Sequence, residues 1–381
     1  MNNQQSILII TRNLPPLIGG MERLNWYIAD ELSKDHPVTI LSHTKAKAIA
    51  PKNATFYSVP LNPLPLFLIC AFCKTFWLCL IRRPDILFAG SGLTAPIAVF
   101  WAKIFRKKSM VYIHGLDIGT NHLLYNLLWI PFIRWANVII ANSSPTYDLC
   151  VQKGISKAKL QIICPGVSYP PSPPNEELIH KIKDQYHLHD KKVLISIGRL
   201  TQRKGLNEFL DLSFSQIVKI VPNTVLIVIG DTPNHSLNKN LQSKELILST
   251  VRKHEIDDKV VFIGNISDYE VLSTFYRVAD IHVFPVKYIP DDPEGFGMVA
   301  IEAAAHGKPT IAFATGGIVD AIQDGKTGFL VEKQNYKALT EATVQVLQGS
   351  VFMNRDVCER YAEQFAWYNL KNKFEKIIVS L

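Results

Sequence analysis

The stretch IHVFPVKYIPDDPEGFGMVAIEAAAHGKPTIAFA, residues 281–314, contains one complete strand–helix–strand pattern. Its first and last runs, IHVFPV and KPTIAFA, are short and apolar, which predicts two buried strands. Between them the chain passes through a Gly-Phe-Gly turn, and an apolar helix is predicted from about Met298 to Gly307, before Pro309. Two buried strands that are joined through a helix are typical of a parallel sheet.

The same alternation of apolar runs and helical segments continues through the whole chain. In the first half the predicted strands are SILIIT, HPVTILSH, DILFAG, KSMVYIHG, NVIIANS and LQIICPGV. In the second half they are KVLISIGRL, TVLIVIGD, KVVFIGNI, IHVFPV, KPTIAFA and GFLV. The chain has 381 residues, of which 48% are hydrophobic, enough for two cores. The sequence therefore predicts an α/β protein with two doubly wound, Rossmann-like domains that face each other across a cleft.

A proline-rich segment marks the boundary between the two predicted domains. The segment contains five prolines, which are Pro165, Pro170, Pro171, Pro173 and Pro174. Prolines so close together cannot continue a sheet or a helix. We place the N-terminal domain at residues 1–168, a linker at 169–185 and the C-terminal domain at 186–359.

Two glutamates eight residues apart, Glu294 and Glu302, are the strongest sign of a binding site. Gly295 and Gly297 let a ligand approach the backbone closely, and the helix that follows can hold a phosphate at its N-terminus. Because Glu294 precedes this helix and Glu302 lies about one turn into it, the two carboxylates can flank a diphosphate and accept hydrogen bonds from hydroxyls. A diphosphate between two sugars describes a nucleotide sugar.

Two cations follow another predicted strand, which closes with Gly198. Arg199 and Lys204 can bind phosphate there, although a solvated basic loop is the alternative. The chain contains no Asp-x-Asp pair, and the adjacent Asp291 and Asp292 are expected to cap or solvate their loop. We therefore expect the two cations to neutralise a leaving diphosphate, with no divalent metal and no cofactor.

The N-terminal half offers two weaker candidates. Gly19 and Gly20 open a helix after the first strand and allow a close approach of a ligand to the backbone, although a tight turn explains them as well. His114 ends a predicted strand, where binding residues gather in parallel sheets, although a single histidine also serves in a core.

The net charge of +8 favours an anionic partner. Nucleic acid, anionic lipid and phosphorylated small molecules all satisfy this condition, but the basic residues do not form a stripe interleaved with aromatic residues, so we expect no nucleic acid partner. The six cysteines lie mostly among apolar residues, which indicates reduced thiols, and the Cys70–Cys73 pair is expected in a packed helix rather than at zinc. With no apparent signal peptide, we expect a cytoplasmic protein.

Apolar and basic segments of the N-terminal half raise the question of a membrane. Residues 64–81 form the longest apolar run, which predicts either a buried helix or a helix on a membrane surface. The basic cluster KIFRKK (103–108) and the segment NHLLYNLLWIPFIRW (121–135) also suit an anionic membrane. Ordinary core helices with a solvated run of charges are the alternative.

Four segments, taken together, resemble the retaining glycosyltransferases of family 4, which have the GT-B fold. The segments are PPLIGGMER (15–23), SIGRLTQRKGL (196–206), FIGNISDYEVLSTFYRVADIHVFPV (262–286) and EGFGMVAIEAAAHGKPTIAFATGGIVDAIQDGKTGFLV (294–331). The resemblance spans most of the chain. It also implies that a C-terminal helix, residues 360–381, returns to the N-terminal domain, which binds the acceptor.

The resemblance implies a role for each matching residue. Glu294 contacts hydroxyls of the donor sugar, Glu302 binds the ribose, and Arg199 with Lys204 binds the diphosphate. His114 is expected beside the reacting sugar. The remaining residues expected at the donor are Gly19, Gly20, Gly198, Gly264, Asn265, Gly295, Phe296, Gly297, Met298 and Val299.

The resemblance further implies transfer of a hexose with retention of configuration, through a front-face displacement. The helical block resembles members that use GDP-mannose or UDP-hexoses, and we favour mannose. The expected acceptor is a lipid-linked or membrane-borne saccharide in the assembly of envelope polysaccharide, such as lipopolysaccharide, or of glycolipid, which implies peripheral contact with the inner face of an anionic membrane. A nucleotide-sugar epimerase of the same fold and a non-catalytic binding subunit are the rival functions.

Overall fold

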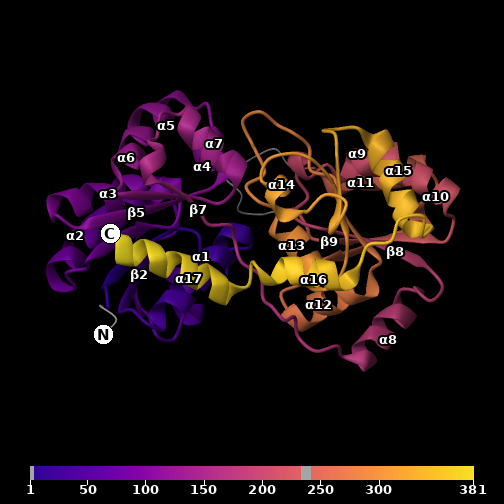
Figure 1. Cartoon of the computed structure of the whole chain (residues 1–381), viewed down its shortest axis with the longest axis horizontal. Coiled ribbons are helices and arrows are strands. Elements are labelled where there is room, and N and C mark those ends of the chain that lie inside the picture. Colours follow the sequence, from indigo (N-terminus) through magenta and orange to yellow (C-terminus); the bar gives the residue numbers. More distant parts are fainter. Residues whose placement is uncertain (1–3, 233–241) are drawn as a thin grey trace. The chain divides into compact units, whose positions relative to one another are not determined.

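Two units make up the chain in the computed structural model, which describes residues 4–232 and 242–381 (Figure 1). The N-terminal unit comprises Met1–Gly166 together with Ala366–Leu381, and the C-terminal unit comprises Val167–Phe365. Residues 1–3 and 233–241 of the predicted domains lie outside the described residues. Each unit has its own parallel sheet, of seven strands in the first and six in the second.

The sheet of the N-terminal unit has the strand order β3-β2-β1-β4-β5-β6-β7. All its neighbouring strands are parallel. The strands are β1 (Ile7–Ile10), β2 (Val38–His43), β3 (Thr55–Val59), β4 (Ile86–Ala89), β5 (Lys108–Ile113), β6 (Val138–Ala141) and β7 (Leu160–Ile162). The order runs outward in both directions from β1 and β4, which is the doubly wound arrangement that buried apolar strands predicted.

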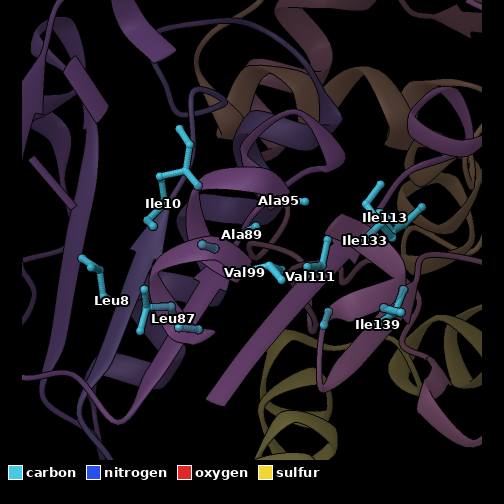
Figure 2. Packing of buried hydrophobic residues seen from close by; sticks show 14 of the residues in the cluster. Leu8, Ile10, Leu87, Ala89, Ala95, Val99, Val111, Ile113, Ile133 and Ile139 are labelled. Carbon is cyan, nitrogen blue, oxygen red and sulfur yellow. The ribbon is translucent and has the colours of Figure 1, made fainter. Parts of the chain in front are cut away.

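Helices cover both faces of this sheet. Side chains that alternate along the strands pack on helices of one face, as Leu87 and Ala89 do in the cluster of Figure 2. Between them Phe88 points the other way and meets Phe374, with ring centroids 5.8 Å apart. The helices are α1 (Gly20–Ser33), α2 (Leu64–Ile81), α3 (Ala95–Ile104), α4 (Gly115–Gly119), α5 (Leu123–Leu128), α6 (Ile130–Trp135), α7 (Ser144–Gln152) and α17 (Trp367–Ser380).

The six-stranded sheet of the C-terminal unit has the order β10-β9-β8-β11-β12-β13, and its neighbouring strands are also parallel. The strands are β8 (Lys192–Ile197), β9 (Thr224–Ile229), β10 (Val260–Gly264), β11 (Ile281–Phe284), β12 (Thr310–Phe313) and β13 (Gly328–Val331). The helices are α8 (Glu176–Gln185), α9 (Leu206–Phe209), α10 (Ser215–Ile220), α11 (Lys244–Lys253), α12 (Tyr269–Val278), α13 (Met298–Ala305), α14 (Ile318–Ala321), α15 (Tyr336–Leu347) and α16 (Arg355–Glu363). Because parallel strands end at one edge, the loops that follow β8, β10, β11 and β12 gather there.

The structure confirms the predicted class of two doubly wound α/β units. It differs from the prediction in two segments, the predicted linker and the predicted C-terminal helix. The region 169–185, predicted as a linker, contains helix α8, which begins after the Asn175 side chain accepts from the Leu178 N–H. In the region 360–381, only α17 joins the N-terminal unit, beside α1 (Figure 1). Helix α16 stays in the C-terminal unit, where it packs on α13.

Candidate active site

The turn after β8 carries the cations of the C-terminal unit. Strand β8 ends at Ile197, and the chain passes through a short helical turn, Gln202–Lys204, before α9. Gly205 has a left-handed φ of 67°, and a Cβ there would collide with the carbonyl oxygen of Pro285. Only glycine suits both conditions, so Gly205 fixes the end of the turn that carries Lys204.

The loop after β11 brings Glu294 to the same edge of the sheet. Gly297 has a left-handed φ of 88° and precedes the first residue of α13, Met298, as predicted from the sequence. Phe296 is buried and lies against Phe365, with ring centroids 5.6 Å apart. The first N–H groups of α13 have no acceptor within the helix, which makes this end suitable for an anion.

A compact ion cluster joins the two loops. The Lys204 Nζ donates to Glu294 Oε2 at 2.8 Å, and Arg203 Nη1 binds the same oxygen. Arg203 Nε also lies 3.3 Å from Asp292 Oδ1. The Lys204 Nζ lies 4.5 Å from the centroid of the Phe284 ring. The side chains of Lys204, Arg203 and Glu294 are only 12–17% exposed, so their charges act in an environment of low polarity.

This burial shifts the pKa values of both partners. Burial lowers the pKa of Lys204 to about 8, although the neighbouring Glu294 opposes the shift. Burial on its own would raise the pKa of Glu294, but Arg203 and Lys204 lower it to about 2. At neutral pH the cluster therefore holds two cations beside the Glu294 carboxylate, with Asp292 as a second acidic partner of Arg203, and such groups suit a diphosphate with a sugar.

A second glycine-containing loop packs against the main chain of Glu294. After β12, Gly316 takes a left-handed φ of 51°, and the Gly317 N–H donates to the Glu294 carbonyl oxygen at 2.9 Å. A Cβ on Gly317 would collide with the Gly295 carbonyl oxygen. The two glycine-containing loops thus pack backbone against backbone, and this contact holds the Glu294 main chain in place.

Arg199 lies close to the cluster. It lines a small pocket at the ends of β8 and β11 together with Gly198, Lys204 and Phe284. The pocket has a volume of about 10 Å³, which is the space of a single water molecule. A ligand of nucleotide size would therefore lie along the open edge of the sheet rather than inside this pocket.

Glu302 has a different set of partners from Glu294. It lies in α13, is 2% exposed, and its Oε2 accepts from the Tyr276 hydroxyl of α12 at 3.0 Å. The Tyr276 ring stacks on His306, with centroids 5.0 Å apart. His306 contacts the Glu302 carbonyl oxygen through Nδ1 and the Ser273 hydroxyl through Nε2, both at 2.7 Å. Burial lowers the pKa of His306 to about 4, so a neutral imidazole braces Tyr276.

Two of the residues predicted at the donor, Gly264 and Asn265, lie at the end of β10. Gly264 has a left-handed φ of 81°, and its carbonyl oxygen accepts from the Gly230 N–H at 2.8 Å. Among the described residues, only Gly264 itself and its two chain neighbours have atoms within 4 Å of the place where a Cβ on Gly264 would be, and Asn265 is exposed. This end of the strand therefore offers open backbone at the same sheet edge as Glu294.

The predicted residues of the N-terminal unit lie at the carboxyl edge of its own sheet. Helix α1 begins at Gly20, and a Cβ on Gly19 would collide with the Glu22 carboxylate. His114 follows β5, is 6% exposed, and its Nε2 lies 3.4 Å from the Gly90 carbonyl oxygen. Burial lowers the pKa of His114, which makes the imidazole neutral at pH 7.

Asp117 organises the turn around His114. Its Oδ2 accepts from the backbone N–H groups of His114 and Gly92, at 3.1 and 2.9 Å. Burial raises the pKa of Asp117. Asn25 of α1 lies beside Gly90, where a Cβ would collide with its Oδ1; it is 1% exposed, and within the described part of the chain neither amide atom has a hydrogen-bond partner. A polar group buried in this way is suited to a ligand that supplies hydroxyls.

Sequence reasoning missed Asp117 and Asn25 in the N-terminal unit and three contributors in the C-terminal unit. Arg203 stands next to Lys204, and the basic doublet before Gly205 is the signal that could have identified it. Asp292 was expected to cap or solvate its loop; it is 8% exposed and pairs with Arg203 instead, because the loop folds back onto the turn after β8. Tyr276 had no signal beyond an apolar helix, since its contact with Glu302 depends on tertiary packing.

Comparison with known families divides the chain in the same two parts. The family described as "Glycosyltransferase Family 4" matches residues 18–169, and the family described as "Glycosyl transferases group 1" matches residues 179–365. Together the two matches include every residue discussed above in both sites.

Characterised relatives are similar over nearly the whole chain. A GDP-mannose-dependent alpha-(1-6)-phosphatidylinositol monomannoside mannosyltransferase of Mycolicibacterium smegmatis is 26% identical, over 90% of this chain and 89% of the relative. The capsular polysaccharide biosynthesis glycosyltransferase CapM of Staphylococcus aureus is 25% identical, over 99% and 98%. Among solved structures, Anabaena HepE in complex with UDP-glucose has a TM-score of 0.81 at 18% identity, over 99% and 100% of the two chains. This last likeness supports the fold.

Proposed function

The chain belongs to the group 1 glycosyltransferases of family 4, which have the GT-B fold, and from this premise we propose that it transfers a hexose from a nucleotide sugar to a saccharide acceptor with retention of configuration. The observation that carries the proposal is the buried cluster of Lys204, Arg203 and Glu294 beside the N-terminus of α13. Such a cluster offers cations to a diphosphate and a carboxylate to sugar hydroxyls.

Each group then has a defined task. Lys204, Arg199 and the first N–H groups of α13 hold the diphosphate, and Glu294 accepts hydrogen bonds from the donor hexose. Glu302 is proposed to bind the ribose, and the open backbone at Gly264 and Asn265 to face the nucleobase. Because the cations are fixed before the ligand arrives, they stabilise the charge that develops on the leaving phosphate without rearrangement.

The reaction proceeds by front-face displacement. The bond between the hexose C1 and the phosphate oxygen breaks, and the acceptor hydroxyl oxygen forms a bond to C1 from the same face. The hydroxyl proton passes to the leaving phosphate oxygen, so retention needs no covalent enzyme intermediate. The neutral imidazole of His114 is proposed to hydrogen-bond the reacting hexose. Lys204 and its neighbours supply positive charge at the diphosphate, and we propose that no divalent metal is required.

GDP-mannose is the donor that we favour. The support is the relationship, at 26% identity and over most of both chains, to a mannosyltransferase that depends on GDP-mannose. A UDP-hexose is the alternative, because a base that is recognised by the backbone near Gly264 leaves no distinguishing side chain in the sequence.

The acceptor is proposed to be a lipid-linked or membrane-borne saccharide of an envelope polysaccharide or glycolipid. Relatives named for a phosphatidylinositol mannoside and for capsular polysaccharide support this class. The N-terminal unit supports it too, because α5 exposes four leucines at 51–79% of their surface, and these are Leu123, Leu124, Leu127 and Leu128. We accordingly propose a cytoplasmic protein at the inner face of the membrane.

A donor screen tests the proposal. Binding and turnover of GDP-, UDP- and ADP-sugars are measured with purified protein, with and without EDTA, for the wild type and for Glu294→Ala and Lys204→Ala. The matched controls are Glu341→Ala and Lys337→Ala, whose side chains are 60% and 87% exposed on α15 of the same unit. We expect one sugar nucleotide to bind in EDTA, both site variants to lose it, and both controls to keep it.

Three outcomes would contradict parts of the proposal. Binding that survives both site substitutions would show that the cluster is not the donor site. Conversion of the bound sugar nucleotide to its epimer without acceptor would identify an epimerase. Tight binding with no transfer to any extracted lipid-linked acceptor would favour a binding subunit.

A further inference from the structure

Helix α2 has an outer face that is mostly apolar, with Lys74 as the charged residue of the helix. Its inner face is anchored in the core by fully buried side chains such as Phe67, Ala71 and Leu78. The outer face repeats at helical spacing. Its apolar members, exposed by 41–62%, are Leu66, Ile69, Phe76, Trp77, Leu80 and Ile81. The predicted alternatives of a buried helix and a surface helix therefore each describe one face of α2.

The net positive charge of the protein is concentrated in the stretch of sequence that contains this helix. Residues 36–116 contain ten lysines and arginines but one acidic residue, Asp85. This part of the chain carries a net charge of +9, and the remainder carries −1. Asp85 lies 3.1 Å from Lys107, so even this carboxylate is paired. The positive charge is thus a property of one stretch of the sequence, which contains both α2 and α3.

Aromatic contacts join the apolar face to basic residues of α3. Phe76 lies 4.9 Å from Trp101 and 5.9 Å from Phe105, measured between ring centroids. Helices α2 and α3 lie side by side at one end of the N-terminal unit (Figure 1). Lys103, in the last turn of α3, and Arg106, just after the helix, are exposed and flank Phe105 in the sequence. On α2 itself, the Lys74 Nζ lies 4.4 Å from the centroid of the Trp77 ring.

We propose that the outer face of α2, together with Lys103 and Arg106, docks on the surface of an anionic lipid bilayer. The inference builds on the proposed membrane-borne acceptor and names the surface that brings the enzyme to it. Aliphatic and aromatic side chains enter the boundary between headgroups and acyl chains, while the flanking cations meet lipid phosphates. Snorkelling side chains such as Lys74 can keep their charge at headgroup level.

Two other arrangements fit the same residues less well. Helix α2 has 18 residues and is long and apolar enough to cross a membrane, but Phe67, Ala71 and Leu78 tie it to the sheet, so it lies along the unit. A second copy of the chain would bring two strongly positive surfaces together around a two-fold axis, and like charges oppose such a contact. An anionic bilayer offers acyl chains to the apolar face of α2 and lipid phosphates to the basic residues.

Vesicle flotation tests the docking surface without donor, acceptor or turnover. The full chain is mixed with vesicles of phosphatidylcholine alone or of phosphatidylcholine with phosphatidylglycerol. We expect binding to the anionic vesicles only, reduced by salt. The variant Ile69→Asp/Leu80→Asp should lose more than about tenfold in partition. Each of Lys103→Ser and Arg106→Asn should lose about fivefold, because a basic residue near an anionic surface contributes on that scale.

Matched variants separate docking from folding and from the donor site. Phe352→Asp changes a residue that is 84% exposed in the C-terminal unit, and Lys337→Ser changes an exposed lysine there. Both should bind vesicles like the wild type. Every variant is also checked for its thermal transition and for sugar-nucleotide binding, so a failed donor proposal leaves the docking result readable.

Several results would overturn the proposal. Equal binding to neutral and anionic vesicles would remove the role of charge, and equal binding by Ile69→Asp/Leu80→Asp and the wild type would remove the role of α2. No vesicle binding by the wild type would reject docking altogether. A dimer in sedimentation velocity that Ile69→Asp/Leu80→Asp dissociates would assign the face to a second copy.

Discussion

In the C-terminal unit, Glu294 lies against Lys204 and Arg203, whereas in the N-terminal unit His114 lies against a backbone carbonyl and a turn held by Asp117. Both sets occupy the carboxyl edge of a parallel sheet, and both are buried. The first set keeps its formal charges, because opposite charges compensate the loss of water. In the second set, burial lowers the pKa of His114 and raises that of Asp117, so both shifts favour the neutral forms.

This difference matches the two halves of a transfer reaction. In the proposed reaction a diphosphate needs cations that are in place before it binds, and we propose that the cluster at Lys204 supplies them. A reacting sugar and an acceptor hydroxyl are neutral, and they need hydrogen-bonding groups that do not attract the diphosphate to the wrong place. One α/β architecture therefore provides two chemically different edges, through the loops that each sheet carries.

The largest expected effect separates the two edges by their affinity for a bare nucleoside diphosphate. Lys204→Met should weaken binding of GDP or UDP by about 10²–10³-fold, because it removes a buried charge that the phosphates face. His114→Ala should change this affinity by less than about threefold, since a neutral group gains little from a diphosphate. Isothermal titration calorimetry measures both. Equal losses of affinity in the two variants would contradict the distinction between a charged edge at Lys204 and a neutral edge at His114.

A slightly smaller effect is expected on turnover at the neutral edge. His114→Ala should lower kcat by about 10²-fold at saturating donor, the scale of a lost hydrogen-bonding partner in a transition state. The control His180→Ala alters an exposed histidine of α8 and should leave kcat unchanged. Single-turnover transfer with the donor identified by the screen gives the rate. A normal kcat with a raised KM would instead place His114 in ground-state binding.

The sequence predicts the features that follow from local patterns, whereas contacts between distant residues need the structure. Apolar strands separated by helices predicted both sheets, because a strand buried on two faces needs a continuous apolar run. Strand β3 was missed, since this edge strand is partly exposed and reads only TFYSV. Glycine turns and the start of α13 were predicted from local rules. The pairing of Asp292 with Arg203 brings together residues 89 positions apart, and no local pattern encodes such a contact.

The pH dependence of donor binding tests the role of the Lys204 charge at the edge of the C-terminal sheet. Because burial lowers the pKa of Lys204 to about 8, the free enzyme loses this charge as the pH rises through 8. Diphosphate favours the protonated lysine, so affinity should be constant below this pH and fall by about tenfold per unit above it. Lys204→Arg stays charged throughout and should remove the fall. Titrations of bare nucleoside diphosphate between neutral and alkaline pH show the profile, and a flat wild-type curve would contradict the role of Lys204.

The smallest expected effect concerns how Glu302 is held. Tyr276→Phe removes the hydroxyl that donates to Glu302 Oε2 at 3.0 Å but keeps the ring that stacks on His306. If Glu302 binds the ribose, its orientation matters for ribose hydroxyls alone, and affinity for a nucleoside diphosphate should fall by about fivefold, the scale of one hydrogen bond. A 2′,3′-dideoxynucleoside diphosphate should bind the wild type and Tyr276→Phe equally. An equal loss with both ligands would show that Tyr276 supports the fold of the edge rather than the orientation of Glu302, and the thermal transition of the variant would then fall in parallel.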